Sequence, residues 1–316
     1  MKNAPTSYSQ PDITLSELLM NFLFEKEVEG ISKNTIKLYN IHITSFINSI
    51  SAKKASAITK KDYHSFIKSL KDSNTKDVTI ASYCRSVRVF LYYGMEVQNI
   101  QYFKITIPKY QKTIKQIYSN EELSLLLKTP NIKKCTFTEY KTWVFENIII
   151  STGLRLSSVL NLQIQDIDLS ENSFTINNTK NKNPTKAYFN QEMALILSKY
   201  LKYRGGNSDD YLICTDTGNK ISLRTMQGNV KRYNNSRGVS KTSIHLFRHT
   251  FAKNAVLAGI DVFTLMRMMQ HSDIQTTLNY VKILNVDAKR SCEVYNPQKQ
   301  FEVNKKQIKP KGGPAK

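Results

Sequence analysis

The chain has 316 residues and carries 46 Lys and Arg against 25 Asp and Glu, a formal charge of +21. Its 40% hydrophobic content and low Gly and Pro content exclude a disordered basic tail and a low-complexity linker protein. No apolar stretch approaches the ~18 residues of a transmembrane helix, no apolar signal region is present, and the cysteines form no CxxC pair, so we expect a cytoplasmic protein without disulfides.

Residues 12–104 are expected to form a small all-helical domain. Apolar residues recur at helical spacing in runs that span 15–22, 36–47, 63–70 and 80–91. Ser32 is a candidate N-cap for the second run, and Thr59 or Asp62 for the third. This spacing predicts helices that bury one apolar face against each other.

Three segments are expected to lie outside the folded domains. Residues 105–118 are β-branched and basic, contain Pro108 and show no helical stripe, which predicts an extended linker. Residues 1–11 and 297–316 lack apolar periodicity, so we expect a flexible N-terminus and a basic, flexible tail.

Residues 119–296 are expected to form a second domain. Ser119 begins a helix that carries Glu121 and Glu122 in its first turn. Short runs of strand-forming residues, separated by polar turns, lie at 166–169, 174–176 and 186–189. From residue 194 onward the pattern is mostly helical again. The predicted fold class is therefore mainly α with a small antiparallel β-sheet.

The positive charge points to a polyanionic partner. The net charge is +5 over 1–104, +3 over 105–118, +8 over 119–296 and +5 over 297–316. A membrane-binding patch is more often one cluster or one amphipathic helix, whereas a distributed excess suits a protein that wraps a duplex. We therefore expect double-stranded DNA as partner and no membrane; a basic but otherwise ordinary soluble protein is the alternative.

Three of the five histidines fall close to an arginine and a tyrosine. His245 and Arg248 lie three positions apart at the start of a predicted helix, so they project from one face. Gly259 ends this helix, and Asp261 caps the next.

A further helix is predicted just after His271. Ser272 and Gln275 have the spacing of a capping box, which places His271 before the helix and Tyr280 about two turns into it. Taken singly, these residues would be caps or core side chains. His245 and His249 have a zinc-binding spacing, but Leu246 replaces the Glu of the zinc-peptidase motif.

Taken together, these motifs resemble the tyrosine recombinase (phage integrase) family. Thr152-Gly153-Leu154-Arg155 is similar to the family's first-arginine box, and HLFRHTFA at 245–252 is similar to its His-x-x-Arg box. HSDIQTTLNY at 271–280 is similar to the family's last box. The predicted hairpin at 178–182 is similar to the hairpin that carries the family's catalytic Lys. The order is that of the family. The resemblance covers 119–296 strongly, as the catalytic domain, and extends to 12–104 as the helical core-binding domain.

The resemblance implies a set of catalytic residues and no metal or cofactor. The implied residues are Arg155, Lys180, His245, Arg248, His271 and Tyr280. Metal-free phosphodiester cleavage needs a side-chain nucleophile, fixed positive charge on the phosphate and a proton for the leaving oxygen. The tyrosine supplies the nucleophile, the arginines clamp the phosphate, and the lysine protonates the 5′-oxygen.

The histidines have supporting roles in this scheme. His245 takes the tyrosine proton or orients the phosphate, since imidazole exists in both protonation states near neutrality. His271 hydrogen-bonds a phosphate oxygen. Lys182 is the alternative to Lys180 as the proton donor.

The resemblance also implies an assembly. The enzyme forms a 3′-phosphotyrosyl intermediate and works through a Holliday junction as a homo-tetramer on paired sites, while the free protein is a monomer or weak oligomer. A helix over 285–295 docks on the neighbouring protomer. The DNA contacts expected in the helical domain are Lys33, Lys37, Arg85 and Arg88. Integration, excision, transposition and resolution of a mobile element all remain open.

Two positions depart from the family pattern. Ser158 stands where the family commonly has an acid three residues after the first arginine, which changes the local electrostatics. Met269-Gln270 replaces the usual Leu-Gly before the last-box histidine and is expected to alter only the turn. A type IB topoisomerase-like strand transferase and a catalytically decayed DNA-binding protein are the alternative functions.

Overall fold

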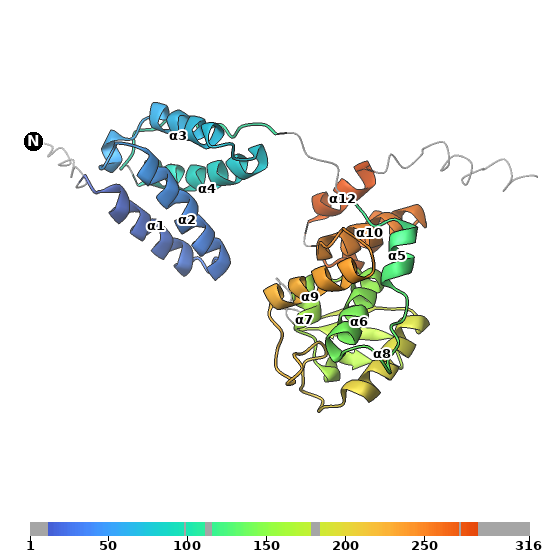
Figure 1. The fold of residues 1–316 in the computed structure, drawn as a ribbon. Helices are drawn as coiled ribbons and strands as arrows, with labels where there is room; N and C mark the ends of the chain where they lie inside the picture. The colour runs from blue at the N-terminus through green and yellow to red at the C-terminus, as the bar shows by residue number, and fades with distance from the viewer. Residues whose placement is uncertain (1–11, 98, 111–115, 178–183, 272, 284–316) are drawn as a thin grey trace, which may run out of the picture. The chain divides into compact units, whose positions relative to one another are not determined.

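The computed structural model describes residues 12–97, 99–110, 116–177, 184–271 and 273–283. Its internal contacts divide it between residues 113 and 114 into an N-terminal and a C-terminal unit, which are described separately (Figure 1). No helix in the described ranges is long and apolar enough to cross a membrane.

The N-terminal unit is helical, as its apolar spacing predicts. Its α-helices are α1 Leu15–Val28, α2 Lys33–Ser49, α3 Lys60–Asp72 and α4 Asp77–Glu96, with the short 3₁₀ turn η1 Ala55–Ala57. Ser32 caps α2, and Thr59 and Asp62 together form a capping box on α3, so both candidate caps of that helix take part.

The core of the N-terminal unit is built from aromatic rings that the helices bury. Phe22 of α1 meets Phe90 of α4 edge to face, with ring centroids 5.7 Å apart, and Phe46 of α2 meets Phe66 of α3 at 5.3 Å. Ile105, beyond α4, is buried in the same cluster. This packing fixes the helical face that carries Arg85, whose guanidinium donates to Tyr110 Oη at 3.0 Å.

The C-terminal unit packs helices around a small sheet. Its elements are α5 Asn120–Leu126, α6 Phe137–Thr152, α7 Leu156–Leu160, η2 Ile164–Asp166, β1 Ile167–Asp168, β2 Ser173–Ile176, β3 Thr185–Tyr188, α8 Gln191–Arg204, α9 Leu223–Ser236, α10 Ile244–Leu257, α11 Val262–Met268 and α12 Ile274–Ile283. The strands form an antiparallel sheet in the order β1-β2-β3, which confirms the predicted fold class.

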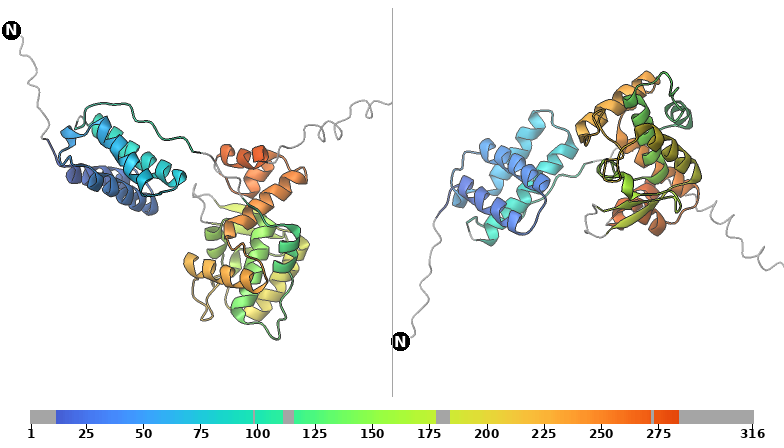
Figure 2. Two further views of the ribbon diagram at one scale, coloured as in Figure 1. Left: turned by 45° about the horizontal axis from the view of Figure 1, so that its top comes forward. Right: turned by 90° about the horizontal axis from the view of Figure 1, so that it is seen from below.

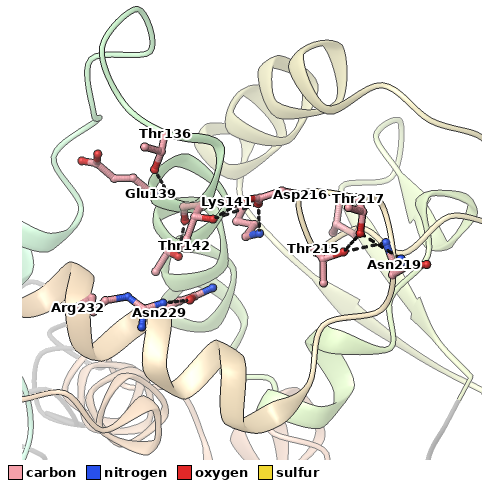
Figure 3. Close-up of polar contacts among 12 residues, drawn as sticks. Thr136, Glu139, Lys141, Thr142, Thr215, Asp216, Thr217, Asn219, Asn229 and Arg232 are labelled. Carbon is pink, nitrogen blue, oxygen red and sulfur yellow. Dashed lines mark hydrogen bonds and ion pairs between the residues drawn. The ribbon is translucent and has the colours of Figure 1, made fainter.

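The helix α6 lies at the centre of this unit and packs against α8, α9 and α10 (Figures 1 and 2). Its residues from Tyr140 to Ile149 are all buried, so the helix is covered on every side. The turn at 215–219 is tied to it: Lys141 Nζ lies 2.8 Å from Asp216 Oδ1 (Figure 3). The lysine hydrogen bond lowers the pKa of Asp216.

A buried carboxyl in α6 is expected to make the stability of this unit depend on pH. Glu146 is 0% exposed, and neither carboxyl oxygen has a hydrogen-bond partner among the described residues. Burial raises the pKa of Glu146 well above its usual 4.5. The folded state therefore keeps a proton that the unfolded state releases.

We expect the free energy of unfolding to fall less steeply with rising pH in Glu146→Gln than in the wild type. In the wild type this group lowers the free energy of unfolding as pH rises above about 4.5, because only the unfolded chain ionises there. Denaturant unfolding from pH 5 to pH 8 measures the slope. Glu192→Gln, on the exposed face of α8, is the control and should keep the wild-type slope. An unchanged slope in Glu146→Gln would contradict the prediction.

Candidate active site

Arg155 is placed by a sharp turn between α6 and α7. The helix α6 ends at Thr152, and Gly153 follows with φ 66°, a left-handed conformation that glycine adopts without strain. Leu154 is buried beside it, and Arg155 takes the N-cap position of α7. The guanidinium of Arg155 is exposed on the surface and donates from Nη1 to the carbonyl of Gln270 at 2.6 Å.

Arg248 comes from α10 and is far more enclosed than Arg155. Its side chain is 6% exposed and donates to the carbonyls of Gly153 and Met269. Burial lowers the pKa of the Arg248 guanidinium to about 10, and the charge of Arg155 acts in the same direction. The group therefore stays protonated at neutral pH, and two positive charges converge on the turn at 269–270.

This turn has the shape that the family's glycine would supply. Gln270 has φ 52°, a left-handed conformation that costs a side-chain-bearing residue about 1–2 kcal/mol. Its side-chain Nε2 donates to Thr185 Oγ1 at 3.0 Å, at the start of β3. The departure at Met269-Gln270 thus keeps the turn and adds a contact to the β2–β3 hairpin.

Tyr280 lies on α12, and its hydroxyl faces α10. The Oη atom is 2.7 Å from Nδ1 of His249, and the two rings are 5.4 Å apart. Burial raises the pKa of Tyr280, while the charges of Arg248 and Arg155 oppose that shift. A tyrosine beside two arginines gains stabilisation when it loses its proton, as a nucleophile must.

His271 lies in the segment that joins α11 to α12. Its ring is nearly parallel to that of Tyr280, with centroids 6.3 Å apart, and its Nδ1 lies 2.8 Å from Thr277 Oγ1. The contact with the fully buried Thr277 orients the imidazole. The helix α12 begins at Ile274, and the Asp273 carboxylate accepts the backbone N–H of Gln275 at 2.9 Å. The predicted cap, Ser272, lies outside the described residues.

The structure brings together Arg155, Arg248, His271 and Tyr280 around the turn at 269–271. His245 starts the same helix as Arg248, but its side chain is exposed and makes no hydrogen bond within the described residues. Lys180, Lys182 and the helix expected over 285–295 lie outside the described residues. The expected DNA contacts Lys33, Lys37 and Arg85 are exposed on α2 and α4, and Arg88 is half-buried.

One residue of the site was missed by the sequence analysis. His249 was weighed only as a zinc ligand, yet it contacts the hydroxyl of Tyr280. Its place one residue after Arg248 was the available signal, but its partner Tyr280 lies 31 positions away on another helix.

Ser158 is buried and lines a cavity of about 150 Å³ that Asp166 and Lys220 also line.

We expect Gly153→Ala to destabilise the C-terminal unit by about 2–4 kcal/mol. A methyl group there would overlap the Phe251 ring of α10, and the left-handed backbone would strain any side chain. Gly259→Ala is the control, since its φ is 86° and no atom of the described residues lies within 4 Å of the added methyl group. Only the strain of about 1–2 kcal/mol then remains. Denaturant unfolding compares the two. Equal losses would contradict the predicted overlap.

Models of known families match both units. The model of the phage integrase family matches residues 115–285, and the N-terminal SAM-like domain of phage integrases matches residues 18–101. Among curated proteins, tyrosine recombinase XerA of Saccharolobus solfataricus is 28% identical, covering 81% of this chain and 85% of its own. Tyrosine recombinase XerC of Staphylococcus aureus is 26% identical, covering 86% of this chain and 92% of its own.

Solved structures share the fold. The Tn1549 transposon integrase in complex with transposon right end DNA has a TM-score of 0.71 at 18% identity, covering 89% of this chain and 100% of its own. A lambda integrase tetramer bound to a Holliday junction has a TM-score of 0.69 at 14% identity, covering 89% of this chain and 81% of its own. These likenesses extend over both units of the chain.

Proposed function

The chain belongs to the phage integrase family, whose enzymes cleave and rejoin DNA, and on that basis we propose that it recombines specific DNA sites through a phosphotyrosine at Tyr280. The observation that carries the proposal is the convergence of Arg155, Arg248 and His271 on the surroundings of the Tyr280 hydroxyl. A tyrosine flanked by two guanidinium groups has the charge needed to receive a phosphate.

The reaction requires no input of energy. Tyr280 Oη gives its proton to a histidine base and attacks the phosphorus. The Oη–P bond forms as the P–O5′ bond breaks, and the products are a 3′-phosphotyrosine and a free 5′-hydroxyl. Arg155 and Arg248 bind the non-bridging oxygens, and His271 donates a hydrogen bond to one of them. Lys180 gives its proton to O5′. A 5′-hydroxyl of a second strand then reverses the attack and restores a DNA phosphodiester.

Exchange between two duplexes needs two such rounds. We propose that four copies of the chain bind paired sites and pass through a Holliday junction, and that the free protein is a monomer or weak oligomer. The lambda integrase tetramer on a Holliday junction and the Tn1549 integrase on circular intermediate DNA support this arrangement and a role in moving a mobile element. Because the proposed substrate is DNA, we propose that the protein acts in the cytoplasm.

A two-site assay tests the proposed function. A plasmid would carry two copies of the DNA that flanks the gene, and recombination should excise the segment between them. A single-site plasmid incubated alongside separates this outcome from simple relaxation. Relaxation of both plasmids without excision would indicate a topoisomerase-like strand transferase, and the absence of any covalent adduct would indicate a decayed enzyme.

We expect DNA cleavage to survive excess EDTA with an unchanged rate. The positive charge that stabilises the phosphate comes from Arg155 and Arg248, which a chelator does not remove. In the described part of the chain, no three His, Cys, Asp or Glu residues form a group that could hold a metal. Adduct formation on a nicked suicide substrate, with and without EDTA, is the measurement. Loss of cleavage that Mg²⁺ restores would contradict the expectation.

A further inference from the structure

The hydroxyl of Tyr280 is held by a histidine that the proposed reaction does not name. His249 Nδ1 lies 2.7 Å from Tyr280 Oη, a short hydrogen bond between a side chain of α10 and one of α12. These two helices pack directly against each other. Arg248 precedes His249 in the chain, so one turn of α10 contacts the nucleophile and provides a clamp for the phosphate.

Resting on the proposed function, we propose that His249 is a further catalytic residue, which accepts the Tyr280 proton during cleavage and returns it during rejoining. In cleavage, the Tyr280 O–H bond breaks as the Oη–P bond forms, and the proton moves to His249 Nδ1. The electron pair of the P–O5′ bond goes to O5′, which takes a proton from Lys180. Rejoining reverses each transfer, so no proton or electron is consumed over the cycle.

Chemistry separates His249 from the other groups around the hydroxyl. Arg155 and Arg248 have only donors, so neither can take a proton. His271 presents its ring nearly parallel to the tyrosine ring at 6.3 Å, and its Nδ1 contacts Thr277. The Nδ1 atom of His271 is therefore engaged by Thr277, whereas the Nδ1 atom of His249 meets the Tyr280 hydroxyl.

His245 is the other histidine of the same helix. It lies one turn before His249, and its side chain is exposed. No hydrogen bond joins it to Tyr280 among the contacts of the described residues, whereas His249 has that bond. The geometry therefore assigns the proton transfer to His249 and leaves His245 to orient the phosphate.

The contact also suits the charge of the reaction. Proton transfer gives a tyrosinate near Arg155 and Arg248 and an imidazolium on α10. The arginine charges favour the tyrosinate, and the anionic phosphate that enters the site offsets the new charge on His249. General base catalysis of this kind typically contributes 10²–10⁴-fold.

Replacing Tyr280 by an analogue that is already ionised near neutral pH tests whether His249 is the base. We expect His249→Ala to slow single-turnover cleavage of a nicked suicide substrate about 10²-fold or more, with DNA binding retained. Site-specific replacement of Tyr280 by a difluorotyrosine, whose hydroxyl ionises near neutral pH, should remove most of that defect. His249→Asn, which keeps a polar group of similar size but accepts no proton, should behave like His249→Ala and guards against a folding effect.

The matched control is His245→Ala. It removes an exposed histidine from the same helix, and its defect should persist with the difluorotyrosine. The assignment fails if His249→Ala and His249→Asn cleave at the wild-type rate or faster, if the difluorotyrosine leaves their defect unchanged, or if it relieves His245→Ala instead. A wild-type chain that forms no adduct would contradict the proposed function itself, whereas normal wild-type adduct with undiminished His249 variants would contradict only this inference.

Discussion

Tyr280→Phe is expected to bind its DNA site with wild-type affinity and to form no covalent adduct. The substitution removes one oxygen, the atom that would attack the phosphorus, and leaves the half-buried ring that packs beside α10 and α11. Its loss of activity should therefore be complete while the fold persists. Denaturing electrophoresis after incubation with a nicked suicide substrate measures the adduct, and a gel shift measures binding.

The chain has 17 tyrosines, so the result needs a matched substitution. Tyr203→Phe on α8 removes the same atom from a side chain that is 49% exposed and outside the site, and it should give the wild-type yield of adduct. An adduct of normal yield with Tyr280→Phe would show that another hydroxyl is the nucleophile, and the assignment of the last box would then be wrong.

Arg155→Ala and Lys180→Ala should both lose activity, but for different reasons. Arg155 is exposed, so its removal should spare the fold and cost about 2–4 kcal/mol of transition-state stabilisation, or roughly 10²–10³-fold in rate, as the loss of one electrostatic donor does. Lys180 is needed only to protonate O5′. A substrate with a 5′-bridging phosphorothiolate has a leaving group that needs no proton, so it should restore cleavage to Lys180→Ala and not to Arg155→Ala.

Lys182→Ala is the control for this experiment and should cleave the ordinary substrate near the wild-type rate. Rescue of Lys182→Ala by the phosphorothiolate, in place of Lys180→Ala, would move the proton donor by two residues along the hairpin. Rescue of neither lysine variant would mean that the proton comes from another group. Each outcome is read as single-turnover adduct formation on paired oxygen and sulfur substrates.

Local patterns in the chain were sufficient to predict most of the elements that hold the site. Helix caps such as Ser32, Thr59 and Ser119 act within three residues of themselves, so their effect is visible in the sequence. The predicted bounds of the strands were correct to within a few residues, although Asp166 lies at the end of the 3₁₀ turn η2 and not in β1. The spacing of Tyr280 from His271 follows from one helix and the turn before it.

Local patterns could not predict the contacts between helices that are far apart in the chain. The burial of Arg248 and of the Glu146 carboxyl cannot be predicted from their neighbours in the chain, because both depend on how α6 packs against the rest of the unit. The left-handed Gln270 is a further case. Its backbone is held by the turn, and its side chain reaches Thr185, 85 residues away.

The sequence by itself determined the helical and strand elements, the net charge that calls for DNA and the order of the motif residues, since each depends on residues near one another in the chain. Only the tertiary structure decided that His249, rather than His245, touches the Tyr280 hydroxyl. Both histidines lie on one face of α10, and their spacing alone does not distinguish them. The packing of α12 against that face brings Tyr280 to the second of them, and no local periodicity records where a partner helix will lie.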